Sequence, residues 1–228
     1  MTKIIMFNLL EREIKEQMTI CAKERKAKVS TDGIYKKEGQ YFWFISIRQY
    51  SSLRYVVSVE IKPWKYDELL FSITHPGETI RFTDKLRCHG FSAMSFHTIS
   101  KTYYPLPPKD DDGKFDLLAF SNWCNTIYRE SIQSLDNFCE MIRTKYDDLD
   151  GFHIANVDSD ILTAAFTYIS SGELKNAERL LLIAQEKQEV FNRSFGSYSR
   201  DLRDVLLDYC RAKQEGIVWS RAMVLGQK

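Results

Sequence analysis

Cysteine and histidine lie close together at one place in the chain, where they could do nucleophilic or metal chemistry. Cys88 is followed directly by His89, and His97 comes later. On one unbroken strand the two histidines would share a face but lie about 26 Å apart, too far to share a metal ion or a proton. Neighbouring side chains on a strand also point to opposite faces, so Cys88 and His89 would not form a dyad. Gly90 could fold the segment back. We expect ordinary packing or surface roles here, with an enzyme centred on these residues as an alternative.

Other catalytic motifs are weaker. Gly90-Phe91-Ser92-Ala93 starts like a nucleophile elbow, but Met94 stands where the closing glycine belongs. The scattered glycines form neither a phosphate-binding loop nor a dinucleotide fingerprint. Five widely spaced cysteines without a Cys-x-x-Cys pair predict neither a zinc site nor a disulfide framework. The sequence therefore predicts a protein that is not an enzyme, with no catalytic residues, no metal site and no cofactor, in a reducing compartment.

Acidic residues gather where two expected helices meet. Paired carboxylates could do acid/base work only where burial moves their pKa values apart. Acids at a helix turn more commonly cap the helix and keep it solvated. The alternative is an acidic surface on which a protein partner docks. The candidate partner-binding residues are Asp147, Asp148, Asp150, Asp158 and Asp160.

The charge is unevenly distributed along the chain. The whole chain has 32 basic and 31 acidic residues, a net charge of +1. Residues 1–105 hold 17 Lys and Arg against 11 Asp and Glu, a balance of +6, and residues 106–228 hold 15 against 20, a balance of −5. This is either the pattern of ordinary solvated faces or an acidic half that meets a basic partner.

The first half of the chain predicts a helix followed by a sheet. Residues 3–28 carry an apolar stripe at helical spacing, and Thr31-Asp32-Gly33 supplies a turn after it. Residues 41–48 and 55–61 alternate between apolar and polar positions, which is typical of half-buried strands. Their short links predict an antiparallel meander. Further strands are expected around 68–74, 79–83 and 92–104. The stripe of the first helix consists of Leu10, Ile14, Met18 and Cys21.

The second half predicts only helices. Three prolines within 105–113 exclude a helix or a central strand there, so this segment is expected to be an exposed connector. Helices are expected at about 114–147, 158–172, 173–190 and 199–215, with Asp158 as an N-cap and Gly172 after a helix end. The fold class is therefore α+β. Residues 1–105 form a helix plus an antiparallel sheet, and residues 106–228 form a bundle of about four helices.

Residues 158–184 have the small and large residues of a tetratricopeptide helix pair. Small alanines would let the two helices approach closely, and larger side chains would fill the gaps. Only one copy is visible, whereas such repeats need neighbours to bury their faces. The segment thus predicts either one tetratricopeptide-like hairpin or an ordinary antiparallel pair of helices. The matching residues are Ile161, Ala164, Ala165, Tyr168, Leu174, Ala177, Leu181 and Ala184.

A basic stretch precedes the aromatic strand at 41–44. Aromatic rings on a sheet beside positive charge could stack RNA bases. The aromatic motif of the common RNA-binding sheet module is absent, and alternation requires either Tyr41 and Trp43 or Phe42 and Phe44 to face the core. An RNA-binding or RNA-processing protein remains the alternative function. The basic residues are Lys23, Arg25, Lys26, Lys28, Lys36 and Lys37.

The order of elements resembles a known family. A leading amphipathic helix, the strand end Gln49-Tyr50-Ser51, a second strand close behind and a helical tail with Ser171-Gly172-Glu173 occur in sequence. They resemble an uncharacterised bacterial domain family with a Gln-x-Ser turn between two strands, found among toxin-immunity genes. The resemblance implies an immunity protein that neutralises a cognate toxin by direct binding, and it supplies no catalytic residues.

The sequence predicts no membrane segment. The apolar run at the N-terminus is interrupted by Asn8 and Glu11, and no cleavage site for a signal peptide follows. The apolar stretch from Ile161 to Ile169 is well short of the roughly 20 residues needed to cross a bilayer. We therefore expect a cytoplasmic, non-catalytic protein whose partner is another protein.

Overall fold

The computed structural model describes residues 3–51, 54–78, 83, 97–105, 116–156, 161–187 and 200–226. The chain divides into two compact units, each made of two segments. Met1–Lys62 and Phe96–Met141 form the sheet unit, and Pro63–Ser95 and Ile142–Lys228 form the helical unit. The architecture is α+β, as predicted. The sequence was expected to divide after residue 105. Instead, Pro63–Ser95 from the first half belongs to the helical unit, and the sheet unit extends into the second half as far as Met141.

The sheet unit contains one antiparallel meander. After helix α1 (Lys3–Arg25), the strands follow one another in the sheet in their order along the chain. The two-residue loop between β2 and β3 begins with Gly39, whose φ of +60° suits the first position of a tight hairpin. The predicted meander is therefore confirmed, with two strands more at its start than the sequence indicated. The strands are β1 (Lys28–Val29), β2 (Gly33–Glu38), β3 (Tyr41–Ser51), β4 (Arg54–Pro63) and β5 (His97–Pro105).

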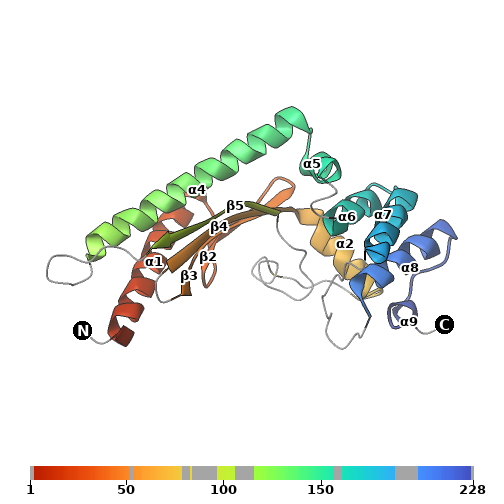
Figure 1. Cartoon of the computed structure of the whole chain (residues 1–228), viewed down its shortest axis with the longest axis horizontal. Helices are drawn as coiled ribbons and strands as arrows, with labels where there is room; N and C mark the ends of the chain where they lie inside the picture. Colours follow the sequence, from red (N-terminus) through yellow and green to blue (C-terminus); the bar gives the residue numbers. More distant parts are fainter. Residues whose placement is uncertain are drawn as a thin grey trace. The chain divides into compact units, whose positions relative to one another are not determined.

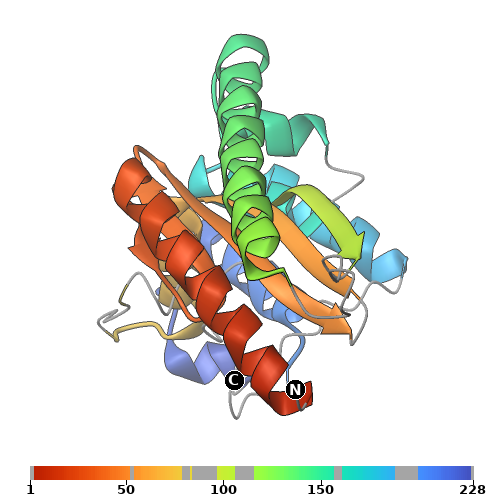
Figure 2. The same cartoon turned by 90° about the vertical axis from the view of Figure 1, so that its left-hand side faces the viewer.

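Two helices cover one face of this sheet. Helix α1 and the long helix α4 (Leu117–Lys145) lie over the same side in Figure 2. Trp123 of α4 packs against Tyr55 of β4 and Tyr104 of β5, with ring centroids 5.7 and 5.5 Å apart. Between the helices, Gln17 donates a hydrogen bond of 2.7 Å to the Ser121 hydroxyl. The predicted stripe of α1 is buried throughout, because it faces this layer.

The middle of the sheet is buried on both faces. In β3, Trp43 and Ile45 point toward the helices, while Phe42 and Phe44 point the other way, yet none of the four is more than 1% exposed. The expectation of half-buried strands is therefore wrong for the centre of β3. Only the end of this strand, from Arg48 onward, is exposed.

The segment expected as a strand at 68–74 is helical. Helix α2 runs from Trp64 to Thr74 and separates β4 from β5 in the chain. It buries Tyr66, Leu70 and Ile73, which have the spacing of one helix face. A helix therefore interrupts the region 1–105, which was expected to hold only the first helix and the strands of the sheet. Residues 97–104 of the strand expected at 92–104 belong to β5. Residue 105, expected to begin the connector at 105–113, is the last residue of that strand. Residues 79–82, 92–96 and 106–113 lie outside the described residues.

The helical unit gathers α2 and the helices that follow α4 (Figure 1). Three of these occur where the sequence predicted helices, and two short ones were not expected. No described helix of the chain has both the length and the apolar character needed to cross a membrane. The helices are α5 (Leu149–Ala155), α6 (Ile161–Ser170), α7 (Leu174–Glu186), α8 (Leu202–Gln214) and α9 (Arg221–Val224).

Helices α6 and α7 form the expected hairpin. Gly172 has a φ of +82° after the end of α6, a conformation that glycine adopts without strain. Ala165 and Ala177, one on each helix, are completely buried, so small side chains occupy the helix contact. Helix α8 packs on α7, and the indole of Trp219 donates a hydrogen bond of 2.7 Å to the carbonyl oxygen of Ile73 in α2. The helical unit therefore has its own apolar core.

Candidate functional site

Three of the five acids proposed as a docking surface lie together around the turn between α4 and α5. Asp148 accepts a hydrogen bond of 2.8 Å from the backbone N–H of Gly151 and so caps α5. Asp150 is bound by two side chains of α2. Asp147 is exposed and has a φ of +64°. Two of these three acids therefore have structural partners, and Asp158 and Asp160 lie outside the described residues.

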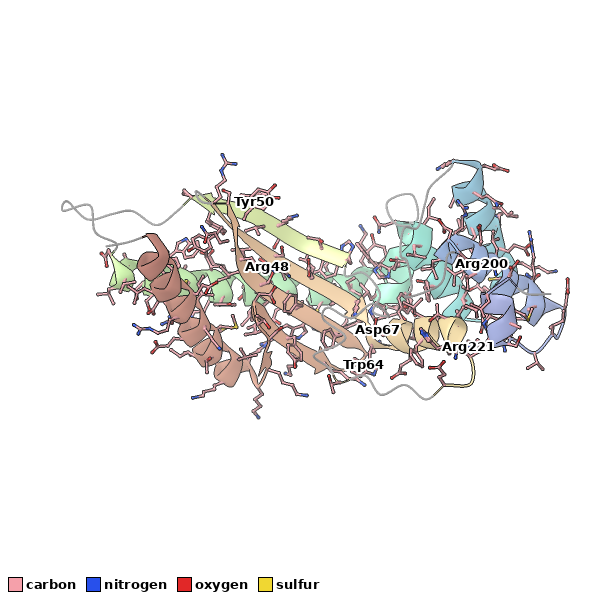
Figure 3. All side chains as sticks on the ribbon, turned by 90° about the horizontal axis from the view of Figure 1, so that it is seen from below. Arg48, Tyr50, Trp64, Asp67, Arg200 and Arg221 are labelled. Atoms are coloured by element: carbon pink, nitrogen blue, oxygen red, sulfur yellow. The ribbon has the colours of Figure 1, made fainter. Side chains whose placement is uncertain are left out.

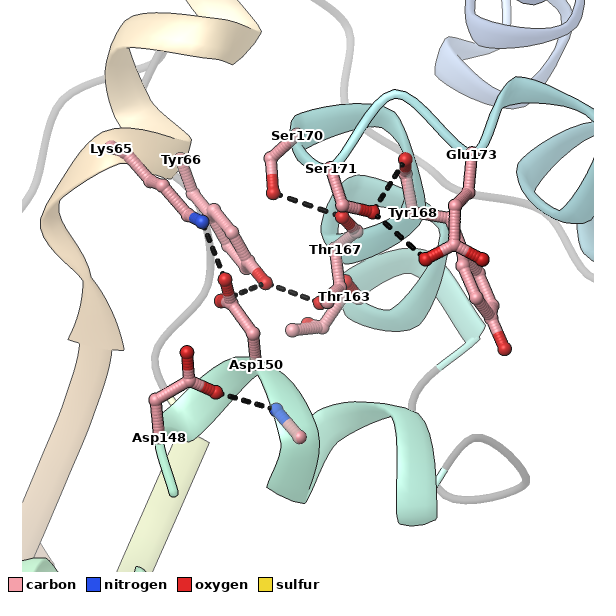
Figure 4. A network of polar contacts seen from close by, with 11 residues as sticks. Lys65, Tyr66, Asp148, Asp150, Thr163, Thr167, Tyr168, Ser170, Ser171 and Glu173 are labelled. Carbon is pink, nitrogen blue, oxygen red and sulfur yellow. Dashed lines mark hydrogen bonds and ion pairs between the residues drawn. The ribbon is translucent and has the colours of Figure 1, made fainter. Parts of the chain in front are cut away.

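The partners of Asp150 make a polar network inside the helical unit (Figure 4). The hydroxyl of Tyr66 donates a hydrogen bond of 2.8 Å to Oδ1 of Asp150, and Lys65 forms an ion pair with the other carboxylate oxygen. The same Tyr66 hydroxyl contacts that of Thr167, which donates to the carbonyl oxygen of Thr163 at 2.9 Å. The network thus joins α2, α5 and α6.

This network is structural in character. Tyr66 is 1% exposed, so its hydroxyl is closed to solvent. Burial raises the pKa of Tyr66 far above its usual range, and the negative charge of Asp150 raises it further. Tyr66 therefore remains a neutral hydrogen-bond donor. The docking role of the acids stays a prediction, with Asp147 as its exposed member.

The cysteine and histidine cluster is described only in part. His97 begins β5 and stacks on Phe138 of α4, with ring centroids 5.5 Å apart and planes at 20°. Cys88, His89 and the Gly90–Ala93 motif lie outside the described residues. Within the described ranges, no three His, Cys, Asp or Glu side chains are grouped so that they could hold a metal ion.

The aromatic strand expected beside the basic stretch does not offer its rings to a ligand. Phe42, Trp43 and Phe44 are at most 1% exposed, and the indole of Trp43 donates a hydrogen bond of 3.1 Å to Glu38. Stacking of bases needs an open ring face. The form of the RNA-binding alternative that relied on these rings therefore finds no support in the geometry.

Exposed tyrosines and cations instead lie at one end of the sheet, on the face opposite α1 and α4. Figure 3 looks at the sheet from this side and labels Arg48 and Tyr50 near the end of β3. Tyr50 is 64% exposed and Tyr103 is 45% exposed. Their rings meet edge to face, with centroids 5.1 Å apart and planes at 77°. We call this group the sheet-end patch, and its members are Arg48, Tyr50, Arg54, Lys101 and Tyr103.

Strand pairing places these residues together. Tyr103 stands opposite Val56, whereas the next residue of β5 contacts α4, so Tyr103 points to the other face. Arg54 stands opposite Pro105 and Lys101 opposite Ser58. Each is therefore two positions from the Val56–Tyr103 pair, which is the diagonal neighbour distance of a sheet. Tyr50 reaches Tyr103 from β3, so three strands contribute to the patch.

The patch has an excess of positive charge. Arg48 forms an ion pair of 2.7 Å with Asp32, and its guanidinium lies 5.8 Å from the centroid of the Phe44 ring. The ammonium of Lys101 lies over the Tyr103 ring, 5.8 Å from its centroid. Neither Lys101 nor Arg54 has an acidic partner within ion-pair distance among the described residues. Asp32 is thus the one acid within ion-pair distance of these three cations in the described part of the chain, and the side chain of Arg48 is still 44% exposed.

A hollow of about 470 Å³ adjoins the patch at Arg48, in the sheet unit. Ile14 and Met18 of α1 and Ile47 of β3 make it apolar, and charged side chains of both signs also line it. Burial raises the pKa of Tyr55, another lining residue, to about 12, so its hydroxyl stays protonated. The hollow lies on the side of the sheet that α1 covers, opposite the face of the patch, and Arg48 is the patch residue that borders it. The charged lining residues are Glu11, Lys15, Asp32 and Arg48.

Sequence reasoning missed the sheet-end patch. Its signal was the Gln49-Tyr50-Ser51 motif, which forms the exposed end of β3 and in which the Gln49 amide donates a hydrogen bond of 2.9 Å to the Ser51 carbonyl oxygen. Lys101 and Tyr103 come from a strand that the sequence placed only roughly. Comparison of the chain with protein-family models, with curated proteins and with solved structures gave no match.

Proposed function

We propose that this chain is a non-catalytic protein that acts by binding another protein through the sheet-end patch. The observation that carries the proposal is the exposed edge-to-face pair of Tyr50 and Tyr103 among Arg48, Arg54 and Lys101. Tyrosine and arginine are enriched at the residues that dominate protein–protein affinity. Tyrosine also supplies a large contact area at a small cost in side-chain entropy.

The specific instance that we propose is an immunity protein that neutralises a cognate toxin by direct binding in the cytoplasm. The support is the resemblance in the order of helix, Gln49-Tyr50-Ser51 motif and helical tail, together with the exposed position of that motif at the end of β3 in the patch. Co-expression of the captured partner with and without the chain tests this instance. The partner alone should arrest growth, and the chain should restore it.

Affinity capture from the cells that express the chain tests the general proposal. The full chain should retain one protein partner at a constant ratio, and treatment with ribonuclease should leave this recovery unchanged. Recovery mainly of RNA, or of proteins that ribonuclease releases, would instead favour the alternative of an RNA-binding protein. The exposed patch would then have to bind RNA, because the rings of Phe42, Trp43 and Phe44 are buried.

A further inference from the structure

We infer that the partner presents a cluster of Asp and Glu side chains to the sheet-end patch, an inference that rests on the proposed function. Three cations converge on this end of the sheet, and Asp32 is the one acid that pairs with them in the described residues. Arg54 and Lys101 lie two positions on either side of the Val56–Tyr103 pair. A partner surface of opposite charge would complement them.

The geometry of the rings favours an acidic protein over a nucleic acid. Successive bases of a single strand stack on ring faces that lie open and nearly parallel. Here the planes of Tyr50 and Tyr103 are at 77°, and the ammonium of Lys101 lies over the Tyr103 ring. The two rings therefore offer no platform for consecutive bases. Their hydroxyls and edges remain available to accept and donate hydrogen bonds at a protein surface.

The cations are suited to carboxylates. A guanidinium such as that of Arg54 can donate two parallel hydrogen bonds to one carboxylate, which gives direction as well as energy. Lys101 is held near Tyr103 by the cation–π contact, so less side-chain freedom is lost when it pairs with an acid. Charged side chains at the rim of a protein–protein interface mainly raise the association rate, and salt screens their effect.

Photo-crosslinking in the cells that express the chain tests the inference directly. The photoreactive amino acid benzoylphenylalanine replaces Pro105, which is exposed, stands opposite Arg54 and lies on the patch face of β5, so all five patch residues stay intact. The matched control places it at Leu118, which is 72% exposed on α4 of the same unit. Peptide mass spectrometry then identifies the crosslinked segment and its composition.

We expect a protein adduct at position 105, absent at position 118, in a segment rich in Asp and Glu. With that partner, the double variant Arg54→Glu and Lys101→Glu should associate about tenfold more slowly at low salt, and the difference should shrink at high salt. An adduct in a segment without acids, or an unchanged association rate, would overturn the inference and leave the proposed function standing. An RNA adduct, or no adduct at position 105, would overturn both.

Discussion

The Tyr66 hydroxyl lies 2.8 Å from Oδ1 of Asp150, and this hydrogen bond ties the first turn of α2 to α5 across 84 residues of sequence. Lys65 pairs with the same carboxylate. Asp150, which sequence reasoning proposed for a docking surface, therefore also links α5 to α2, and its docking role stays a prediction. Acids at a helix turn can be surface charges or anchors, and their partners in space decide which.

Replacing Tyr66 with phenylalanine should destabilise the protein. The change removes the donor to Asp150 and the contact with Thr167 while it keeps the ring, so buried polar groups lose a partner. The expected loss in the free energy of unfolding is about 1–3 kcal/mol. Urea denaturation measures it. The control is Tyr168→Phe, a half-buried tyrosine of α6. Equal effects of the two changes would show that the network contributes nothing.

Enlarging Ala177 should disrupt the α6–α7 hairpin. Ala177 is completely buried within the core of the helical unit, so a leucine there would force neighbouring side chains apart. The expected loss of stability for Ala177→Leu is about 1–3 kcal/mol. The control is Arg179→Leu on the exposed side of the same helix, which should change stability by less than about 0.5 kcal/mol. A similar result for both variants would contradict close packing of the two helices.

Three cysteines should make the stability fall in alkaline solution. Burial raises the pKa of Cys21 to about 11 and those of Cys124 and Cys210 to about 12, from a usual value of 9.0. Unfolded thiols lose their protons near pH 9 while the folded ones keep them. Their contribution to stability is therefore complete below about pH 9, declines as the pH rises above that value, and is fully lost once the pH has passed about 11 for Cys21 and about 12 for Cys124 and Cys210. Each thiol should contribute a slope of about 1 kcal/mol per pH unit in that window.

The variant Cys124→Ala checks this assignment, because it removes one of the three buried thiols. Chemical denaturation between pH 8 and 11 should show a shallower decline for the variant than for the parent, although the variant starts from a lower stability. Parallel curves would mean that the buried thiol has no part in the pH dependence.

The local elements of the fold were predictable where a pattern ran long enough. The apolar residues of α1 from Leu10 to Cys21 recur at helical spacing, and all of them lie on the buried face. Gly172, with its positive φ, follows the end of α6. Helix α2 was missed because an apolar run as short as Leu69 to Ile73 fits a strand as well as a helix. Its helical face is set by burial in a core whose other members come from more than 90 residues away.

The sheet-end patch could not be read from the sequence for a related reason. Tyr50 and Tyr103 are far apart in the chain, and the pairing of β4 with β5 brings them together. Such pairing depends on long-range contacts that local residue types do not encode. The aromatic residues that stood out in the sequence, Phe42 to Phe44, belong to the core.

The affinity of the captured partner for the parent and for the double variant Tyr50→Ala and Tyr103→Ala tests the central claim most directly. Both tyrosines are exposed, so the free energy of unfolding of the variant should lie within about 0.5 kcal/mol of that of the parent. The same is expected of the control Leu118→Ala. Loss of hot-spot tyrosines costs about 2 kcal/mol or more, so the Kd should rise at least roughly 30-fold. The control should bind like the parent. A Kd for the tyrosine variant equal to that of the parent would contradict binding through the sheet-end patch.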